Sequence, residues 1–296
     1  MSASPAAPPT LGPSESPPHM TPLDAAVMRQ AARENFPVAA WFLPRRVRRD
    51  LLNLYGFARL TDDLGDEAAG DRGALLDWLE GELRAVYAGL PTHPAMRRLR
   101  ATVRRFDLPA TPFQRLIQAN RQDQTVRRYP TYAELAGYCA LSANPVGHLV
   151  LYVLGAATPD RIELSDRVCT GLQLVEHWQD VAEDFAMDRV YLPQDELSRF
   201  GVSEDDLAAR RPSPAFRRLM AFEVARAQAL LGEGAPLAAT LRGRARIAVA
   251  AFVEGGRAAL RAIEQADYDV LTQSPRPTRL AKTGAAWRAL RTVWQA

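Results

Sequence analysis

Two short stretches of the sequence contain carboxylates at four-residue spacing, and these residue types suggest metal or phosphate chemistry. The first, FARLTDDLGDE, contains Asp62 and Asp66, and the second, LQLVEHWQDVAEDF, contains Glu176, Asp180 and Asp184. On an α-helix, residues four apart lie on the same face, so each stretch presents a column of acids. Acids so placed repel one another, and hard cations such as Mg²⁺, which prefer oxygen ligands, would offset that repulsion.

The residues around both columns are mostly apolar, which separates these stretches from an ordinary solvated helix face. With 34 acids in 296 residues, about four pairs at this spacing arise by chance, so the spacing alone is weak. Tyr55 and Arg59 share the stripe of the first column, and Gln173 shares that of the second. The apolar neighbours are Leu51, Leu52, Leu54, Phe57 and Leu60, and then Leu172, Leu174, Val175, Trp178 and Val181. Acids embedded in apolar helices are rarely buried without a partner, so we favour metal binding over a solvated surface.

Composition and charge indicate a globular chain and argue against several classes of function. Hydrophobic residues make up 47% of the chain and charged residues 24%, as in soluble globular proteins. No run approaches the ~18 apolar residues of a transmembrane helix. The net charge of +3 is mild, and the basic residues, all arginine except Lys282, form no stripe interleaved with aromatic residues. Nucleic-acid binding is therefore not expected.

The chain divides into a short tail and one domain. Residues 1–20, MSASPAAPPTLGPSESPPHM, are predicted to be a disordered Pro/Ser/Ala-rich tail, and the remaining residues 21–296 a single helical domain. The tail has neither a basic start nor an apolar run, so we do not interpret it as a secretory signal. Cys139 and Cys169 lie in apolar contexts, which predicts small core residues rather than a disulfide and fits a cytoplasmic protein.

The elements that must position the acid columns are all helices. The periodicity and the intervening Gly and Pro residues predict helices near 22–34, 45–65, 71–89, 92–106, 110–126, 131–156, 160–184, 215–232, 236–267 and 277–294. Pro145 interrupts the 131–156 pattern, which predicts either a kink near Ser142–Pro145 or a break between two helices. No segment has convincing strand periodicity, and no linker separates two domains. The predicted fold class is therefore all-α, as a single-domain bundle.

Taken together, these segments resemble the squalene/phytoene synthase family over roughly residues 30–270. The segments that show the resemblance are ENFPVAAWFLPRRVRRDLLNLYGFARLTDDLGDE, YCALSANPVG and GLQLVEHWQDVAEDFAMDRVYLP. Within the family, ENFPVA, SANPVG and WQDVAED are most similar to the hydroxysqualene synthase branch of bacterial hopanoid biosynthesis. The resemblance implies an isoprenoid-synthase-type helical bundle around a central cavity, with the two acid motifs facing each other near its mouth.

The resemblance also implies roles for particular residues. Mg²⁺ ions held by the two motifs would grip an isoprenoid diphosphate and neutralise it as a leaving group. The residues implied as catalytic and metal-binding are Asp62, Asp66, Asp180 and Asp184, with Glu176 as a further metal ligand. The residues implied as substrate-binding are Arg59, Tyr55, Gln173, Arg189 and Asn144. A carbocation formed in this way must be kept from water while it rearranges, which requires an enclosed cavity.

Two positions depart from the family pattern. Glu176 stands where relatives usually have asparagine, and a carboxylate there would add negative charge to the metal site. Condensing relatives carry a tyrosine, proposed to assist proton removal, in a YCxYVAG segment, and Leu141 occupies the position that aligns with it. Joining two farnesyl diphosphates requires that proton removal, whereas ionising preformed presqualene diphosphate and capturing the cation with water does not.

We therefore favour the conversion of presqualene diphosphate to hydroxysqualene as the predicted activity, which is that of a carbon–oxygen lyase. The alternative is head-to-head condensation of two farnesyl diphosphates by a prenyltransferase that makes presqualene diphosphate, squalene or phytoene. A second alternative is a non-catalytic family member that acts as an assembly factor. Retention of the four aspartates argues against that last alternative.

Further expectations concern single residues and partners. His177 lies one position off the second acid column, which favours a packed or hydrogen-bonded histidine over a metal ligand. The C-terminal segment RPTRLAKTGAAWRALRTVWQA is basic and amphipathic, and both a membrane-surface helix and a closing helix of the bundle fit its pattern. Peripheral contact with the inner face of the cell membrane and association with other hopanoid-pathway enzymes remain open expectations.

Overall fold

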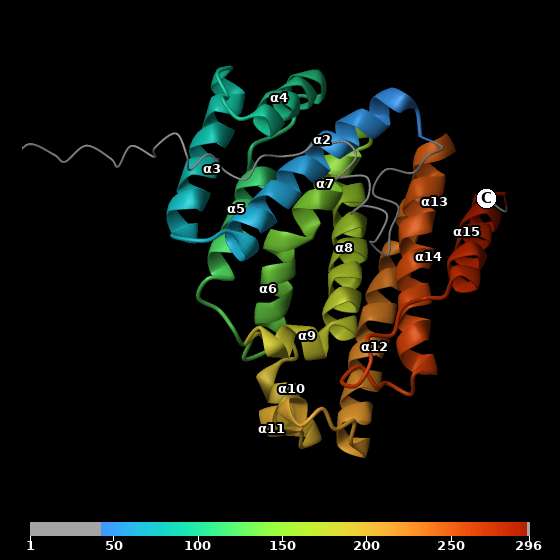
Figure 1. The fold of residues 1–296 in the computed structure, drawn as a ribbon. Helices are drawn as coiled ribbons and strands as arrows, with labels where there is room; N and C mark the ends of the chain where they lie inside the picture. The colour runs from blue at the N-terminus through green and yellow to red at the C-terminus, as the bar shows by residue number, and fades with distance from the viewer. Residues whose placement is uncertain (1–42, 295–296) are drawn as a thin grey trace, which may run out of the picture.

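The structure, a computed structural model, describes residues 43–294, and the regular elements in this range are helices (Figure 1). They are α2 (Arg45–Asp62), the π-helix η1 (Asp63–Glu67), α3 (Arg72–Ala88), α4 (Pro94–Phe106), α5 (Thr111–Gln122), α6 (Tyr132–Ser142), α7 (Asn144–Val153), α8 (Pro159–Gln179), α9 (Val181–Ala186), α10 (Gln194–Phe200), α11 (Glu204–Ala208), α12 (Pro214–Gly234), α13 (Pro236–Thr240), α14 (Gly243–Gln265) and α15 (Arg279–Trp294). The predicted tail 1–20 and helix 22–34 lie outside the described residues. Within the described range, no helix is both long and apolar enough to cross a bilayer.

The helices pack around two large apolar clusters, and each acid stretch belongs to a different one. In the first cluster, Phe57 of α2 meets Phe113 of α5 edge to face, with ring centroids 5.0 Å apart. In the second, Trp178 of α8 is fully buried and its indole N–H donates to the carbonyl of Glu223 on α12, at 3.2 Å. The all-α prediction is therefore confirmed, and the bundle brings two separately packed halves together at the acids.

Several predicted helices are interrupted, and the interruptions have local causes. The predicted 131–156 helix ends at Ser142 and restarts at Asn144, with Pro145 in the first turn of α7, so the break suggested by Pro145 is present. The predicted 236–267 helix is wrong as one element, because Leu241 and Arg242 adopt extended backbone angles between α13 and α14. The short helices α10 and α11 were not predicted, although Ser203 and Asp206 form a capping box at the start of α11.

Both acid stretches lie where the helix departs from α geometry. The predicted 45–65 helix widens into the π turn η1, in which the Ala68 N–H donates to the Asp63 carbonyl at 2.8 Å. The predicted 160–184 helix is wrong as a continuous element, because Asp180 (φ −108°, ψ 16°) separates α8 from α9. Wide turns of this kind are frequent at functional sites, and here one follows directly after Asp62.

Close contact between α8 and α12 fixes the position of the second acid stretch, and glycine makes that contact possible. A Cβ added at Gly234 of α12 would lie 2.6 Å from Val168 Cγ2 and 2.9 Å from the Leu164 carbonyl oxygen, both on α8. A Cβ at Gly232, two residues earlier, would meet nothing within 4 Å. The two glycines therefore form a matched pair for testing this contact.

We expect Gly234→Ala to lower the free energy of unfolding by about 1–3 kcal/mol, because the helices must move apart to admit a methyl group. Gly232→Ala should be neutral or raise it by about 0.5–1 kcal/mol, since alanine favours helix and no clash arises. Urea unfolding of both variants against the parent measures the difference. Equal effects of the two substitutions would contradict the proposed contact.

Candidate functional site

The two acid stretches meet at one cavity of about 310 Å³. The cavity is lined mainly by polar residues: Asp62, Asp66, Asn120, Asp123, Tyr138, Ser142, Gln173, Glu176, His177, Asp180, Asp184, Arg189 and Tyr191, with Leu116 and Ala119 as apolar members. A cavity of this size and polarity suits a charged head group rather than a long hydrocarbon chain.

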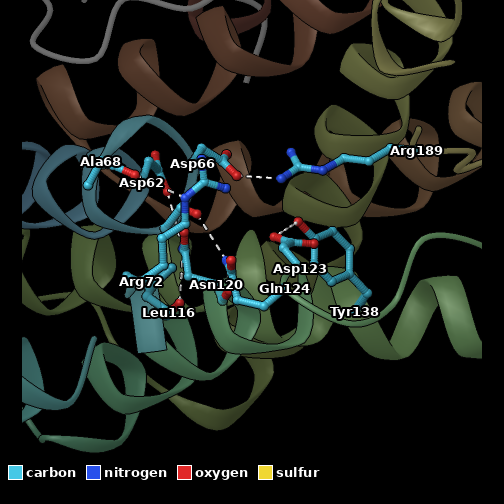
Figure 2. Close-up of polar contacts among 11 residues, drawn as sticks. Asp62, Asp66, Ala68, Arg72, Leu116, Asn120, Asp123, Gln124, Tyr138 and Arg189 are labelled. Carbon is cyan, nitrogen blue, oxygen red and sulfur yellow. Dashed lines mark hydrogen bonds and ion pairs between the residues drawn. The ribbon is translucent and has the colours of Figure 1, made fainter. Parts of the chain in front are cut away.

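Helix α5 and the turn that follows it hold the first acid stretch in place (Figure 2). The Asn120 side-chain amide donates to an Asp62 carboxylate oxygen at 3.3 Å, and the Gln124 amide donates to the Gly65 carbonyl at 2.9 Å. Gly65 is required for this approach, because a Cβ there would lie 2.2 Å from the Asn120 side-chain oxygen. The glycine between Asp62 and Asp66 therefore lets α5 support the π turn directly.

Arg189 joins the two halves of the site. It follows α9, and its guanidinium forms an ion pair with Asp66 across the cavity, as Figure 2 shows. Only 13% of its side chain is exposed, and its backbone N–H donates to the Asp184 carbonyl at 2.9 Å. An arginine so fixed presents a planar fork that matches phosphate oxygens. The structure thus places Arg189 in the cavity and not on the outer surface.

The second acid stretch contacts the segment between α14 and α15. Arg276 lies 2.7 Å from an Asp180 carboxylate oxygen, and the Ser274 hydroxyl donates to the same oxygen at 3.3 Å. The Gln179 side-chain amide also donates to the carbonyl of Pro275. These contacts come from residues almost a hundred positions later in the chain, and they explain why the helix break at Asp180 could not be predicted from local periodicity.

Several cavity residues were not anticipated from the sequence. The Tyr138 hydroxyl donates to Asp123 at 2.8 Å, and the His177 ring stacks on Tyr191 with centroids 3.7 Å apart. His177 also lies 3.2 Å from the Gln173 amide nitrogen, so it is packed and hydrogen-bonded as expected. In the sequence, Asp123 could have been identified as a site residue only from its position, three residues after Asn120 at the end of an amphipathic helix. For the tyrosines, only the tertiary fold reveals the role.

The lining contains six carboxylates and one arginine, and this excess of negative charge shapes the local protonation. Desolvation and repulsion from Asp180 raise the pKa of Asp184 to about 7. Desolvation likewise raises the pKa of Asp62 to about 7 and that of Asp123 to about 6. Asp62 is exposed, whereas only 15% of the Asp184 side chain is exposed. Solvent therefore moderates the rise in the pKa of Asp62 more than the rise in the pKa of Asp184.

Burial lowers the pKa of His177, whereas it raises the pKa of the carboxylates. Desolvation, with a smaller contribution from Arg189, lowers the pKa of His177 to about 3, so the imidazole is neutral at ordinary pH. A neutral ring adds no positive charge to the cavity. The carboxylates therefore depend on arginines, protons or bound cations to balance their charge.

The donor set fits a hard divalent cation bound together with an anionic ligand. Buried Asp123 has one carboxylate oxygen without a hydrogen-bond partner, facing a cavity that is rich in acids. Among residues 43–294, no three acidic, histidine or cysteine side chains converge on a single point. Mg²⁺ in phosphate sites is bound by one or two carboxylates with waters and substrate oxygens, so it does not require such a cluster.

The structure brings together most, but not all, of the predicted site residues. Those that line the cavity are Asp62, Asp66, Gln173, Glu176, Asp180, Asp184 and Arg189. Arg59 lies outside this lining and pairs with Asp63 at 2.6 Å and Glu67 at 2.5 Å. Buried Asn144 accepts a hydrogen bond from Thr170 at 3.0 Å and joins α7 to α8. Tyr55 is half-buried on α2 and is likewise not a lining residue.

The inference drawn from Leu141 stays a prediction, because the structure shows where residue 141 lies and not which reaction occurs. Leu141 packs against an apolar cluster and does not line the cavity, whereas Tyr138, one helical turn earlier on α6, does. The site therefore contains a phenol hydrogen-bonded to a carboxylate. A phenol is thus missing at position 141 but present one turn earlier, so condensation of two diphosphates stays the alternative.

We expect Asp184→Asn to stabilise the metal-free protein by about 1–3 kcal/mol at pH 8. The raised pKa means that, above pH 7, the folded protein bears a charged, desolvated carboxylate, while below about pH 4 the group is neutral in both states. The gain should therefore fall to zero as the pH is lowered from 8 to 4. Urea unfolding with EDTA across this range measures it, with exposed Glu264→Gln as control. A loss of stability at pH 8 would refute the charge argument.

Comparisons with known proteins agree with this geometry. The family model for squalene/phytoene synthase matches residues 29–283. A hydroxysqualene synthase of Rhodopseudomonas palustris is 36% identical over 210 residues, which cover 71% of this chain and 72% of that protein. A hydroxysqualene synthase of Sinorhizobium fredii is 37% identical over 213 residues, which cover 71% of this chain and 72% of that protein.

The helical arrangement is also similar to that of a solved structure. The crystal structure of squalene synthase HpnC from Alicyclobacillus acidocaldarius is 43% identical in sequence and superimposes with a TM-score of 0.78. The match covers 83% of this chain and 94% of that one. With two acid stretches facing one cavity inside this fold, the chain belongs to the squalene/phytoene synthase family.

Proposed function

We propose that this protein is a hydroxysqualene synthase, which converts presqualene diphosphate and water into hydroxysqualene and diphosphate. The observation that carries the proposal is the meeting of two acid stretches at one cavity, with Arg189 between them. The choice of this reaction within the family is supported by the names of the two curated relatives and by the segments ENFPVA, SANPVG and WQDVAED.

The reaction places three demands on the protein. The bond between carbon and the diphosphate oxygen breaks, the cyclopropylcarbinyl cation rearranges, and the oxygen of water forms the new carbon–oxygen bond. The proton lost by that water leaves with the diphosphate or solvent. The site must therefore stabilise the leaving group, delay water until the skeleton has rearranged, and then admit one water molecule.

The acid stretches and Arg189 meet the first demand. The residues that would hold Mg²⁺ are Asp62, Asp66, Asp180 and Asp184, with Glu176 beside them. Bound Mg²⁺ supplies positive charge that stabilises the departing diphosphate. We propose that Arg189 then exchanges Asp66 for a diphosphate oxygen, because its fork already faces the cavity from a backbone anchored to Asp184.

One observation favours a second candidate, the head-to-head condensation of two farnesyl diphosphates. That reaction needs a proton acceptor near the allylic chain, and the hydrogen-bonded Tyr138–Asp123 pair, which lines the cavity, would supply one. Burial and nearby Tyr191 and Asp123 raise the pKa of Tyr138, so the phenol is neutral and would transfer a proton only through its carboxylate partner. A non-catalytic assembly role is less consistent with six carboxylates in one cavity.

We expect activity to require Mg²⁺ and both acid stretches. Asp62→Ala and Asp180→Ala should each lower kcat on the order of 10³-fold, because each removes charge that holds the cation on the leaving group. Asp77→Ala, on the exposed face of α3, is the control and should retain activity. Diphosphate release is measured with and without EDTA, and circular dichroism checks the fold. Full activity in EDTA, or in either variant, would exclude the metal assignment.

The product distinguishes the two candidate reactions. With presqualene diphosphate and Mg²⁺ but no NADPH, we expect a C30 alcohol and diphosphate, and ¹⁸O-labelled water should place its label in the alcohol. Farnesyl diphosphate alone should be a poor substrate. Mass spectrometry of the extracted product provides the measurement. Efficient condensation of farnesyl diphosphate, or formation of squalene only with NADPH, would favour the alternative.

A further inference from the structure

Helix α15 has one face that completes the bundle. Ala285 and Ala289 are buried, at 5% and 1% exposure, and the helix runs along α14 at the edge of the molecule in Figure 1. The Arg288 guanidinium lies 2.7 Å from Glu254 of α14 and fixes the rotation of the helix. The C-terminal segment is thus a closing helix of the bundle, which was one of its two predicted roles.

The opposite face of α15 is apolar and open to solvent. Leu280 is 84% exposed and Trp287 is 70% exposed, and Leu290 is partly exposed beside them. Seven residues at 100° per residue place Leu280 and Trp287 within ~20° of the same line along the helix. Three of the seven large apolar side chains that are exposed in the described range lie on this one helix. Such grouping, unlike a single exposed leucine, is typical of an interaction surface.

The charge of the same segment identifies the kind of surface it would meet. From Val270 to the C-terminus the sequence contains five basic residues, Arg276, Arg279, Lys282, Arg288 and Arg291, and no acid. The formal charge of the segment is therefore +5, and within it Arg276 pairs with Asp180 and Arg288 with Glu254. Exposed tryptophan and leucine in a strongly basic segment are complementary to an anionic phospholipid surface.

The exposed face also begins close to the cavity. Arg276 contacts Asp180, and Leu280 follows only four residues later, so their Cα atoms are at most ~15 Å apart. Contact of α15 with a bilayer would therefore bring the rim of the acid cavity near the lipid. A protein that draws an oily substrate from a membrane would benefit from this placement.

We propose that the Leu280–Trp287 face of α15 docks on an anionic phospholipid bilayer. The apolar side chains enter the interfacial region, and the excess positive charge of the segment favours acidic head groups. The proposal does not depend on which reaction the protein catalyses, because vesicle binding needs no substrate.

The test uses the full chain and measures cosedimentation with two kinds of vesicle, phosphatidylcholine alone and phosphatidylcholine with phosphatidylglycerol. The double variant Leu280→Ser/Trp287→Ser is compared with the control Leu90→Ser/Val146→Ser, which removes exposed apolar side chains elsewhere. The parent and the control should bind the anionic vesicles at least about tenfold more strongly than the neutral ones, and added salt should weaken that binding. The α15 variant should lose about tenfold or more in affinity for anionic vesicles while keeping its thermal unfolding midpoint.

Three results of the vesicle assay would overturn the proposal. They are no vesicle binding by the parent, equal binding to both vesicle types, and undiminished binding by the α15 variant. Light scattering without lipid provides an independent check on the occupant. If the parent is a dimer that the α15 variant converts to a monomer, the face binds a second copy of the chain instead. Tryptophan fluorescence would locate the contact on this helix. Mixing with anionic vesicles should shift the emission of the parent to shorter wavelength, and this shift should be absent when only Trp287 is replaced.

Discussion

The cavity between the two acid stretches holds a surplus of negative charge, and the packing around it must keep these like charges close together. Six carboxylates share the cavity with Arg189, and their mutual repulsion must be balanced for the bundle to close. Arg189 and Arg276 balance part of it by pairing with Asp66 and Asp180, one on each acid stretch. Desolvation, together with the remaining repulsion, raises the pKa values of Asp62, Asp123 and Asp184. The same electrostatic cost would favour the binding of Mg²⁺ that we propose for this cavity.

Two apolar clusters oppose that repulsion from outside. Phe57 and Phe113 anchor the first acid stretch, and Trp178 anchors the second. Neither stretch can move away from the cavity without exposing buried apolar side chains. Gly65 and Gly234 then allow backbone contacts that larger residues would prevent. The burial of these apolar side chains therefore offsets the repulsion between the carboxylates. This arrangement explains why acids with strongly shifted protonation lie at the junction of the two halves rather than at the outer surface.

Much of this arrangement could be predicted from the sequence, and the exceptions have physical reasons. The helices, the acid stretches and Arg189 follow from periodicity and motif, which are local properties. The roles of Asp123 and Tyr138 depend on a contact between α5 and α6, and the break at Asp180 coincides with contacts made by residues from Ser274 to Arg276. The sequence pattern at Leu141 gave no indication that Tyr138, one turn earlier on the same helix, would be the residue that lines the cavity.

The π turn η1 has a consequence for how this site could change in evolution. A π turn is equivalent to one extra residue in an α-helix, and here that residue separates Asp62 from Asp66. Deleting one residue between Asp63 and Gly65 would turn this stretch into a regular helix in which Asp66 follows Asp62 by three positions instead of four, so the Asp66 side chain would point in a different direction around the helix axis. Asp66 would then leave Arg189. Relatives that change the length of this stretch must therefore rebuild the electrostatic junction, so its length is constrained even where individual residue types are not.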